Sequence, residues 1–344
     1  MKQTKYSSYL EGNLVEGCKL CVKGQKMVLF VTGLCSRGCE FCPLSNMRKN
    51  IDNVYANERK ITNENSFNEI IEEVKISGAK GCSLTGGDPL LKLEKTIKLA
   101  KKLKETFTKK FHIHIYVSTK LVTEDKLEKL SKYIDEIRFH PDFDKPVKEE
   151  IKKIAIAKKF WNKKNIGIEI PCFPDKIDKI LELIKEAKDY ISFLNLNELE
   201  SGEVSEKYMN KKYKISKDGY TISNSIDAGK YLIKKINSFA PKLNIHLCTA
   251  ELKNWHQYKN RLKNYKIPKF TKMTKDGTII YFATEVSKEL ILTLRKNEYS
   301  LDKIKNRIIL NPKLVLKLKD KYPIYKIEEY PTYEREECEV ELLK

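Results

Sequence analysis

The sequence predicts an α/β protein: a partial (β/α)6 barrel followed by a small β-rich C-terminal domain. Short apolar runs alternate with helical hydrophobic periods from residue 26 to about residue 265, which is the pattern of βαβ units around a parallel sheet. Beyond Pro268 the pattern changes to strand-like runs such as GTIIYFATEV, ELILTLRK and RIILNPKLVLKLK. A chain of 344 residues is long enough for one large domain with an appendage.

The elements of the barrel follow in order along the chain. The first strand is expected at KMVLFVTGLC (26–35) and the second at GCSLTGGDP (81–89), whose glycines mark a tight exit. Between them, Ser66 and Glu69 form a capping box before a helix that Gly78 ends. Four more strands are expected at 111–119, 136–141, 166–173 and 193–199, with a seventh, short one at 244–248. The remaining helices are expected at 91–108, 123–133, 146–162, 175–188, 225–238 and up to about residue 264.

These elements divide the chain into three parts. Residues 1–25 form a leader that contains a CxxC pair, residues 26–265 form the barrel, and residues 266–344 form the β-rich domain. A polar stretch at 201–224 interrupts the barrel. Its length suits a lid over the barrel or a surface insertion equally well.

Composition excludes a membrane span, because the longest apolar run, Met27 to Leu34, is far shorter than the roughly 20 residues that cross a bilayer. The N-terminus lacks the apolar segment of a secretory signal, so we expect a cytoplasmic protein. The net charge of +20 suggests a polyanionic partner such as nucleic acid. However, 59 of the 67 basic residues are Lys, and Arg is preferred for phosphate recognition. We therefore favour a solvated lysine surface.

The strongest motif is CSRGCEFC, in which Cys35, Cys39 and Cys42 have the spacing CxxxCxxC on the loop after the first strand. Three thiolates from one loop can hold three corners of a 4Fe-4S cluster and leave the fourth iron open. A structural zinc ion needs four ligands, so the alternative is a zinc site completed by a distant Cys or His.

This motif resembles that of the radical S-adenosylmethionine (SAM) superfamily, and the likeness covers roughly residues 26–250. The run GCKLCVKGQKMVLFVTGLCSRGCEFCPLS is similar to archaeal proteins related to pyruvate formate-lyase activating enzyme. The resemblance implies a radical SAM barrel in which the open iron binds SAM and its reductive cleavage yields a 5'-deoxyadenosyl radical. It also implies an electron donor such as ferredoxin or flavodoxin.

The resemblance further implies which residues bind SAM. GGDP, with Gly86, Gly87 and Asp88, looks like the family's GGE motif, whose backbone binds the amino group of the methionyl moiety. Phe41, the residue before the third cysteine, matches the position that packs against adenine. By the same analogy Ser118 is a carboxylate or ribose contact, and Glu169 or Asn195 is a ribose contact.

Alternation along the strands predicts a polar barrel interior. In HIHIYVS the residues Ile113, Ile115 and Val117 should face the helices, so the alternate residues point inward. The same reasoning turns Arg138, His140, Glu169, Asn195 and Asn197 inward. A wet, charged interior implies a chamber for a polar ligand, with His114, Arg138 and His140 as the candidate substrate contacts. For each histidine alone, a satisfied core residue is the alternative.

Cys18 and Cys21 form a second pair that Cys248, with Cys172 or His246, could complete as an auxiliary iron-sulfur cluster or metal site. A redox dithiol and no special role are the alternatives. For such a site the leader must fold back along the barrel wall. Cys82 and Cys338 are expected to be ordinary small apolar residues.

Together these features predict a radical SAM enzyme that modifies a macromolecule, RNA or protein, with help from a basic C-terminal domain. The first alternative is a small-molecule enzyme of cofactor or lipid biosynthesis, with the 201–224 loop closing over the chamber. The second is a non-catalytic zinc or iron-sulfur binding module.

Overall fold

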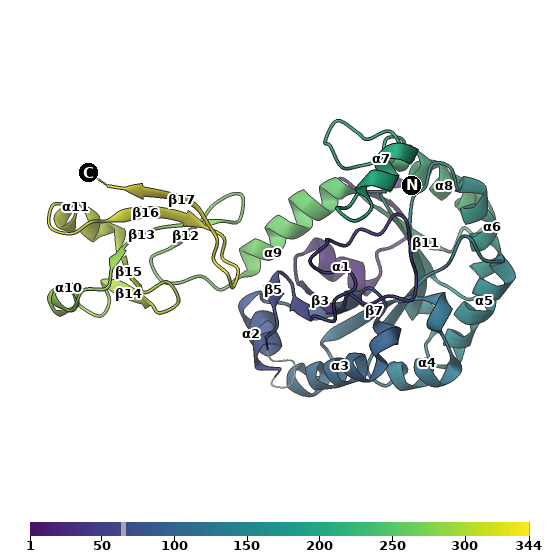
Figure 1. Ribbon diagram of the computed structural model, residues 1–344, viewed down its shortest axis with the longest axis horizontal. Coiled ribbons are helices and arrows are strands. Elements are labelled where there is room, and N and C mark those ends of the chain that lie inside the picture. Colours follow the sequence, from purple (N-terminus) through teal and green to yellow (C-terminus); the bar gives the residue numbers. More distant parts are fainter. Residues whose placement is uncertain (63–66, 344) are drawn as a thin grey trace.

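The computed structural model describes residues 1–62 and 67–343 of the chain. Seven parallel strands in this part of the chain curve into an open barrel, in the spatial order β11-β10-β9-β8-β7-β6-β3 (Figure 1). The strands are β3 (Lys26–Thr32), β6 (Gly81–Gly86), β7 (His112–Ser118), β8 (Glu136–His140), β9 (Ile166–Pro171), β10 (Phe193–Asn197) and β11 (Asn244–Cys248). The predicted α/β barrel is confirmed.

Amphipathic helices cover the outer face of the barrel (Figure 1). They are α2 (Asn68–Ile76), α3 (Leu93–Phe107), α4 (Glu124–Ser131), α5 (Val147–Ile156), α6 (Ile177–Ala187) and α8 (Ser225–Phe239). Short turns of helix adjoin them at η1 (Pro89–Lys92), η2 (Thr119–Leu121), η3 (Ala157–Lys159) and η4 (Lys163–Asn165). Ile113, Ile115 and Val117 belong to the core between sheet and helices, which confirms that they face outward. Ser66 of the predicted capping box lies outside the described residues.

The leader folds back onto the barrel in a way that the sequence only partly indicates. Strands β1 (Lys2–Gln3) and β2 (Tyr9–Glu11) form a hairpin, and β2 pairs antiparallel with β11. The next helix, α1 (Glu16–Val22), lies within the ring of strands (Figure 1). A Cβ on Gly17 would lie 2.4 Å from His114 Nδ1, so α1 packs directly against the inner side of β7.

The other edge of the sheet carries a second short hairpin, β4 (Tyr55–Ala56) and β5 (Arg59–Lys60). A helix formed by the π-helical turn η5 (Leu252–Gln257) and α9 (Tyr258–Asn264) packs beside α1. Asn260 Nδ2 in α9 donates to Val22 O at 2.7 Å. The leader and this helix thereby fix each other at the open side of the barrel.

Residues after α9 form a six-stranded antiparallel sheet beside the barrel (Figure 1). Its strands are β12 (Lys272–Met273), β13 (Ile279–Glu285), β14 (Tyr299–Asp302), β15 (Arg307–Leu310), β16 (Tyr325–Glu329) and β17 (Glu337–Leu342). Its helices are α10 (Lys288–Thr293), η6 (Pro312–Leu314) and α11 (Val315–Leu318). The guanidinium of Arg59 lies 3.4 Å from the centre of the Tyr333 ring, so the sheet contacts the barrel through β5.

The predicted loop 201–224 folds around helix α7 (Glu206–Lys212), and bridges join Glu200 to Thr221 and Ile215 to Ile222. Glu203 accepts two hydrogen bonds from Asn46, at 2.7 and 3.0 Å. The segment is therefore anchored to the loop that follows the three clustered cysteines. None of the described helices is long and apolar enough to cross a membrane.

Candidate active site

The three clustered cysteines lie on the loop that leaves β3, at the carboxyl end of the barrel strands. Cys35, Cys39 and Cys42 are half-buried free thiols. Burial raises the pKa of Cys35 and Cys39, and neighbouring thiols of the trio raise it further. The three sulfurs are therefore within electrostatic reach of one another.

Two cations hold this loop against the neighbouring strand ends. Arg37, between the first two cysteines, donates through Nη1 to His140 O at 2.9 Å and Pro141 O at 3.2 Å. Its Nη2 lies 3.2 Å from Asp142 Oδ1. Lys120 donates to Ser36 O at 2.6 Å. The loop conformation is thus fixed by the exits of β7 and β8.

The GGDP turn supports the same loop from the other side. Cβ atoms on Gly86 and Gly87 would lie 2.3 Å from the carbonyl oxygens of Thr32 and Leu34, and Gly86 has a φ of 146°. Only glycine fits so close to the strand that leads into Cys35. Asp88 is fully buried: its carboxylate caps η1 by accepting from Leu90 N at 3.0 Å, and it accepts from Ser118 Oγ at 2.5 Å.

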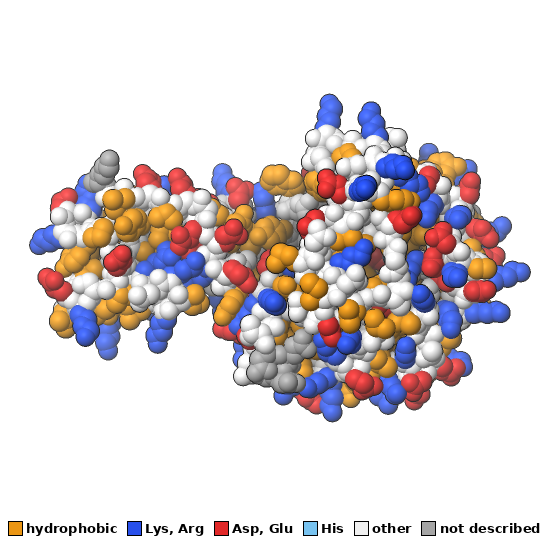
Figure 2. Space-filling view, viewed as in Figure 1, with side chains coloured by type: hydrophobic (Ala, Val, Ile, Leu, Met, Phe, Trp, Pro, Cys, Tyr) orange, Lys and Arg blue, Asp and Glu red, His pale blue; other side chains and the backbone are white. Residues whose placement is uncertain are grey.

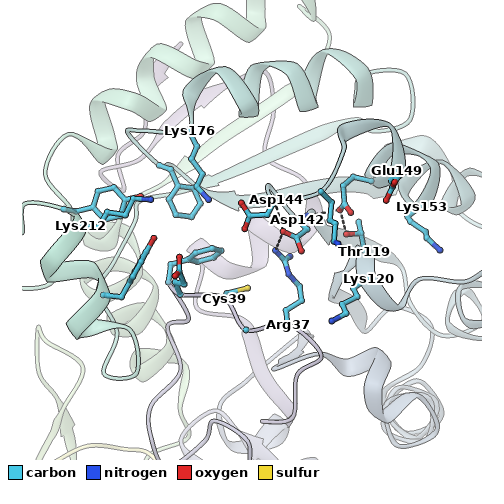
Figure 3. Close-up of a pocket in the computed structure, with 18 residues that line it drawn as sticks. Arg37, Cys39, Thr119, Lys120, Asp142, Asp144, Glu149, Lys153, Lys176 and Lys212 are labelled. Carbon is cyan, nitrogen blue, oxygen red and sulfur yellow. Dashed lines mark hydrogen bonds and ion pairs between the residues drawn. The ribbon is translucent and has the colours of Figure 1, made fainter.

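A cavity of about 700 Å³ opens beside the cysteine loop (Figure 3). Cys39 and Phe41 line it from the loop, and Thr119 and Asp142 line it from the ends of β7 and β8. Figure 3 shows Lys176 and Lys212 on one side and Lys120 and Lys153 on the other. Helix α7 contributes Tyr208 and Lys212. The 201–224 segment therefore forms part of the cavity wall.

The donor set suits an iron-sulfur cluster better than a single ion. Among the described residues, no three His, Cys, Asp or Glu side chains converge to hold one metal ion. Zinc needs such convergence, so the zinc alternative finds no ligand group in this part of the chain. In a cluster each thiolate binds a different iron. Three unpaired thiols on one braced loop fit that requirement.

The barrel interior is polar, as the alternation predicts, but it is not an open chamber at the level of His114 and Arg138. Both side chains are buried beneath α1. Arg138 donates through Nε to Glu136 Oε1 at 2.6 Å and through Nη1 to Glu169 Oε2 at 2.7 Å. His114 Nδ1 contacts Lys26 Nζ. The expected chamber is filled here because the leader helix occupies it.

The predicted SAM contacts on β9 and β10 belong to the upper part of the same network. Glu169 accepts from Asn195 Nδ2 at 2.9 Å and from Asn197 Nδ2 at 3.0 Å. Burial alone would raise the pKa of Glu169, but Arg138 and the two amides lower it below its usual value. Its carboxylate is therefore held ionised between three donors. His140 lies near the cysteine loop, its ring centre 5.9 Å from that of Phe41.

Two residues of this network, Lys26 and Glu136, are not among the site residues predicted from the sequence. Lys26 begins β3 and Glu136 begins β8, and both are buried inside the barrel. Alternation of the strand could have placed Glu136 inward with Arg138, two residues on. Nothing in the sequence indicates that Gly17 brings α1 against them, because that contact depends on where the leader inserts.

The structure places Cys18, Cys21 and Cys248 of the predicted second cysteine site within electrostatic reach of one another, but not its other candidate ligands. Cys18 Sγ accepts from Asn195 Nδ2 at 3.2 Å inside the barrel. Cys172 instead faces α8, with its sulfur 3.0 Å from the position of a Cβ on Gly229, and His246 Nε2 pairs with Ser8 Oγ at 3.1 Å. Cys172 and His246 are therefore engaged elsewhere. Cys82 is a core residue as expected, whereas Cys338 is exposed.

Residues 29–154 match the radical SAM superfamily. A Methanocaldococcus jannaschii protein, provisionally named a glycyl-radical enzyme activating enzyme, is 37% identical over 98% of this chain and 96% of its own length. Among solved structures, a histidine-tagged anSMEcpe with bound AdoMet is similar, with 15% identity and a TM-score of 0.38 over 74% of this chain and 72% of that one. A TM-score of this size does not establish a common fold.

The relative covers the leader, the barrel and the C-terminal sheet alike, and the family match includes the strand, the cysteine loop and the GGDP turn that surround the cavity. These matches favour an enzyme over a non-catalytic binding module. The chain is therefore an enzyme of the radical SAM superfamily.

Proposed function

We propose that the enzyme cleaves SAM reductively at a 4Fe-4S cluster held by Cys35, Cys39 and Cys42, and that it removes a hydrogen atom from a glycine residue of a partner protein. The observation that carries the proposal is the trio of unpaired thiols on a braced loop beside a large cavity. When bound, the reduced cluster supplies the electron that splits the sulfonium bond and yields a 5'-deoxyadenosyl radical. A ferredoxin or flavodoxin supplies electrons to the cluster.

The residues of this chain have separate tasks in the proposal. Arg37 and Lys120 hold the cysteine loop on the strand ends. The GGDP turn and Phe41 receive the methionyl and adenine parts of SAM, and Ser118 positions the turn through Asp88. Glu169 and Asn195 lie within the barrel for the ribose. Because Arg138 and His114 are buried in the network, we assign Arg138 to supporting Glu169 and His114 to packing against Lys26, rather than either to touching substrate.

A protein substrate is favoured over RNA by the charges at the cavity. Six basic side chains line it, but so do five acidic ones, Glu40, Asp142, Asp144, Glu149 and Glu150. A phosphate backbone needs a groove of one sign. The C-terminal residues 266–344 carry 17 Lys and Arg against 13 Asp and Glu, so this domain contributes only +4 of the net charge of +20. Figure 2 shows basic side chains scattered among acidic ones on this face.

We choose a glycine residue as the site of hydrogen removal because the relative is named a glycyl-radical enzyme activating enzyme. Transfer of a hydrogen isotope from glycine to 5'-deoxyadenosine tests this choice. Protein from cells grown on glycine deuterated at Cα is mixed anaerobically with the reconstituted, reduced enzyme and SAM. The 5'-deoxyadenosine formed should carry deuterium, because the radical takes the glycine Cα hydrogen. Unlabelled protein from the same cells is the matched control.

A parallel reaction with RNA from the same cells separates the two macromolecules. Stimulation of 5'-deoxyadenosine formation by RNA and not by protein would overturn the choice of substrate. Stimulation by neither fraction, but by a protein-free extract of small metabolites, would favour cofactor or lipid biosynthesis instead.

A further inference from the structure

Helix α1 presents two thiols to the inside of the barrel, away from the cluster loop. Cys18 and Cys21 are three residues apart, so they lie on one face of the helix. Cys18 is buried and Cys21 is half-buried, and both are free. Burial lowers the pKa of Lys26, and a thiolate at Cys21 would offset this in part, so Cys21 lies within electrostatic reach of the buried Lys26.

The surroundings of this pair suit a dithiol and not a metal. In the described part of the chain no third ligand joins them to hold an ion. The tight packing of Gly17 on His114, Arg138 and Glu136 leaves no space for a cluster between α1 and β7. The guanidinium of Arg138 is ion-paired with the carboxylates of both Glu136 and Glu169, so its charge is compensated without a thiolate at Cys18.

We propose that Cys18 and Cys21 form a reversible disulfide that couples the thiol redox state to the hydrogen bonds of Glu169 inside the barrel. Cys18 Sγ is held by Asn195 Nδ2 at 3.2 Å and Arg138 Nη2 at 3.4 Å. The same two side chains hold Glu169. Forming the disulfide would draw the Cys18 sulfur away from Asn195 and Arg138. Both side chains would then be free to change their hydrogen bonds to Glu169.

The chemistry is thiol exchange with a small-molecule disulfide such as oxidised glutathione. Cys21, the more exposed thiol, loses its proton and attacks, which releases one glutathione thiol. Cys18 then loses its proton and attacks the mixed disulfide, which releases the second. Two protein thiols are oxidised by two electrons, and one external disulfide is reduced to two thiols.

Peptide mapping tests the pair directly. The full chain is equilibrated anaerobically in graded mixtures of reduced and oxidised glutathione, free thiols are blocked in acid, and the chain is cut with trypsin. Cleavage after Lys19 and Lys23 places the two cysteines in different peptides, 6–19 and 20–23. A disulfide therefore appears as these peptides joined, with two hydrogen atoms lost. We expect that species to rise with oxidation, and it should be unchanged in a Cys82→Ser control.

Variants of the neighbouring amides test the link to the network. Asn195→Ala removes a donor to Cys18 from the reduced form only, and a hydrogen bond of about 1 kcal/mol is worth about a fivefold change in an equilibrium constant. The disulfide should thus form about fivefold more readily. Asn197→Ala, which removes a contact to Glu169 but none to Cys18, should leave it unchanged.

Two outcomes would overturn the proposal: a glutathione adduct on Cys21 that never resolves to the joined peptides, or Cys21 joined to Cys248 instead of Cys18. Neither outcome depends on SAM cleavage. Failure of the disulfide proposal can therefore be distinguished from failure of the proposed function, which is measured by the release of 5'-deoxyadenosine.

Discussion

The guanidinium of Arg37 and the carboxylate of Asp142 form an ion pair of 3.2 Å that joins the cysteine loop to the end of β8. The Arg37 side chain is only 8% exposed. Asp142 is held in turn, because its backbone N donates to Glu150 Oε2 at 2.8 Å and Glu150 also accepts from Thr119. A chain of contacts thus runs from helix α5 to the loop that bears the cluster ligands.

Replacing Arg37 should loosen that loop. Arg37→Gln loses the ion pair and at least one of two carbonyl contacts, and a hydrogen bond to a charged group is worth about 1.5–3 kcal/mol. We expect less than half the wild-type iron per chain after reconstitution and a broadened electron paramagnetic resonance signal. Arg295→Gln, at an exposed arginine in the turn between α10 and β14, is the control. Wild-type iron content and line shape in Arg37→Gln would show that the loop does not need this clamp.

Asp88 should act through position rather than through contact with SAM. Asp88→Asn keeps an acceptor for Leu90 N, whereas Asp88→Ala removes the acceptor for both Leu90 and Ser118. We expect Asp88→Ala to weaken SAM binding at least tenfold and Asp88→Asn to weaken it by less than threefold, as measured by equilibrium binding of labelled SAM. Equal losses in both variants would mean that the negative charge itself is required.

Overpacking at Gly17 should expel the leader helix. Ala is favoured over Gly in a helix by about 1 kcal/mol. Here its Cβ would lie 2.4 Å from His114 Nδ1, 2.5 Å from Arg138 Nη2 and 2.8 Å from Glu136 Oε1, and overpacking of this kind costs about 1–3 kcal/mol. Gly17→Ala should therefore lower the free energy of unfolding, as measured in urea. Gly38→Ala, with nothing within 4 Å, is the control, and a stabilised Gly17→Ala would contradict the packing.

Acid should destabilise the fold through its buried histidines. Burial lowers the pKa of His112, His140 and His246 to about 4, against about 6.5 in the unfolded chain. Between these values the unfolded chain binds more protons, so stability is full above about pH 6.5 and falls as the pH drops toward 4. Each such histidine contributes up to about 1.4 kcal/mol per pH unit.

The change in the free energy of unfolding with pH is measured from urea unfolding midpoints between pH 7 and pH 5, and this dependence is the slope compared below. His246→Leu should reduce it, because one titrating group is lost and Ser8 keeps its partner Thr4 at 2.8 Å. His256→Leu, on the helix that follows β11, is the control. An unchanged slope in His246→Leu would mean that His246 is not buried in its neutral form.

The barrel and its cysteine loop could be predicted from the sequence because their signals are local. The outward face of β7 shows in the alternation of Ile113, Ile115 and Val117, and the glycines of GGDP mark the turn that packs on β3. The place of the leader helix inside the barrel could not be predicted, because the charged Glu16 and Lys19 interrupt its apolar residues. Its place inside the barrel depends on contacts with His114 and Arg138, which are distant in sequence.

The sequence predicts a polar chamber inside the barrel, whereas the structure fills it with α1 at the level of His114 and Arg138. Alternation shows that Arg138 points inward, but not that Gly17 and Cys18 meet it there. The brace formed by Arg37 and Asp142 also joins residues far apart in the chain. Pairings of this kind follow from the register of neighbouring strands, which the sequence of one strand does not specify.

The release of 5'-deoxyadenosine measures whether Cys35, Cys39 and Cys42 hold a cluster that cleaves SAM. The reconstituted chain is incubated anaerobically with SAM and dithionite, and the product is quantified by chromatography. We predict more than one 5'-deoxyadenosine per chain from the wild type, a loss of at least a hundredfold when Cys35, Cys39 or Cys42 is changed to Ala, and no such loss in Cys82→Ala. A fully iron-loaded wild-type chain that releases none, or a Cys35, Cys39 or Cys42 variant that releases as much as the wild type, would contradict a SAM-cleaving cluster at these cysteines.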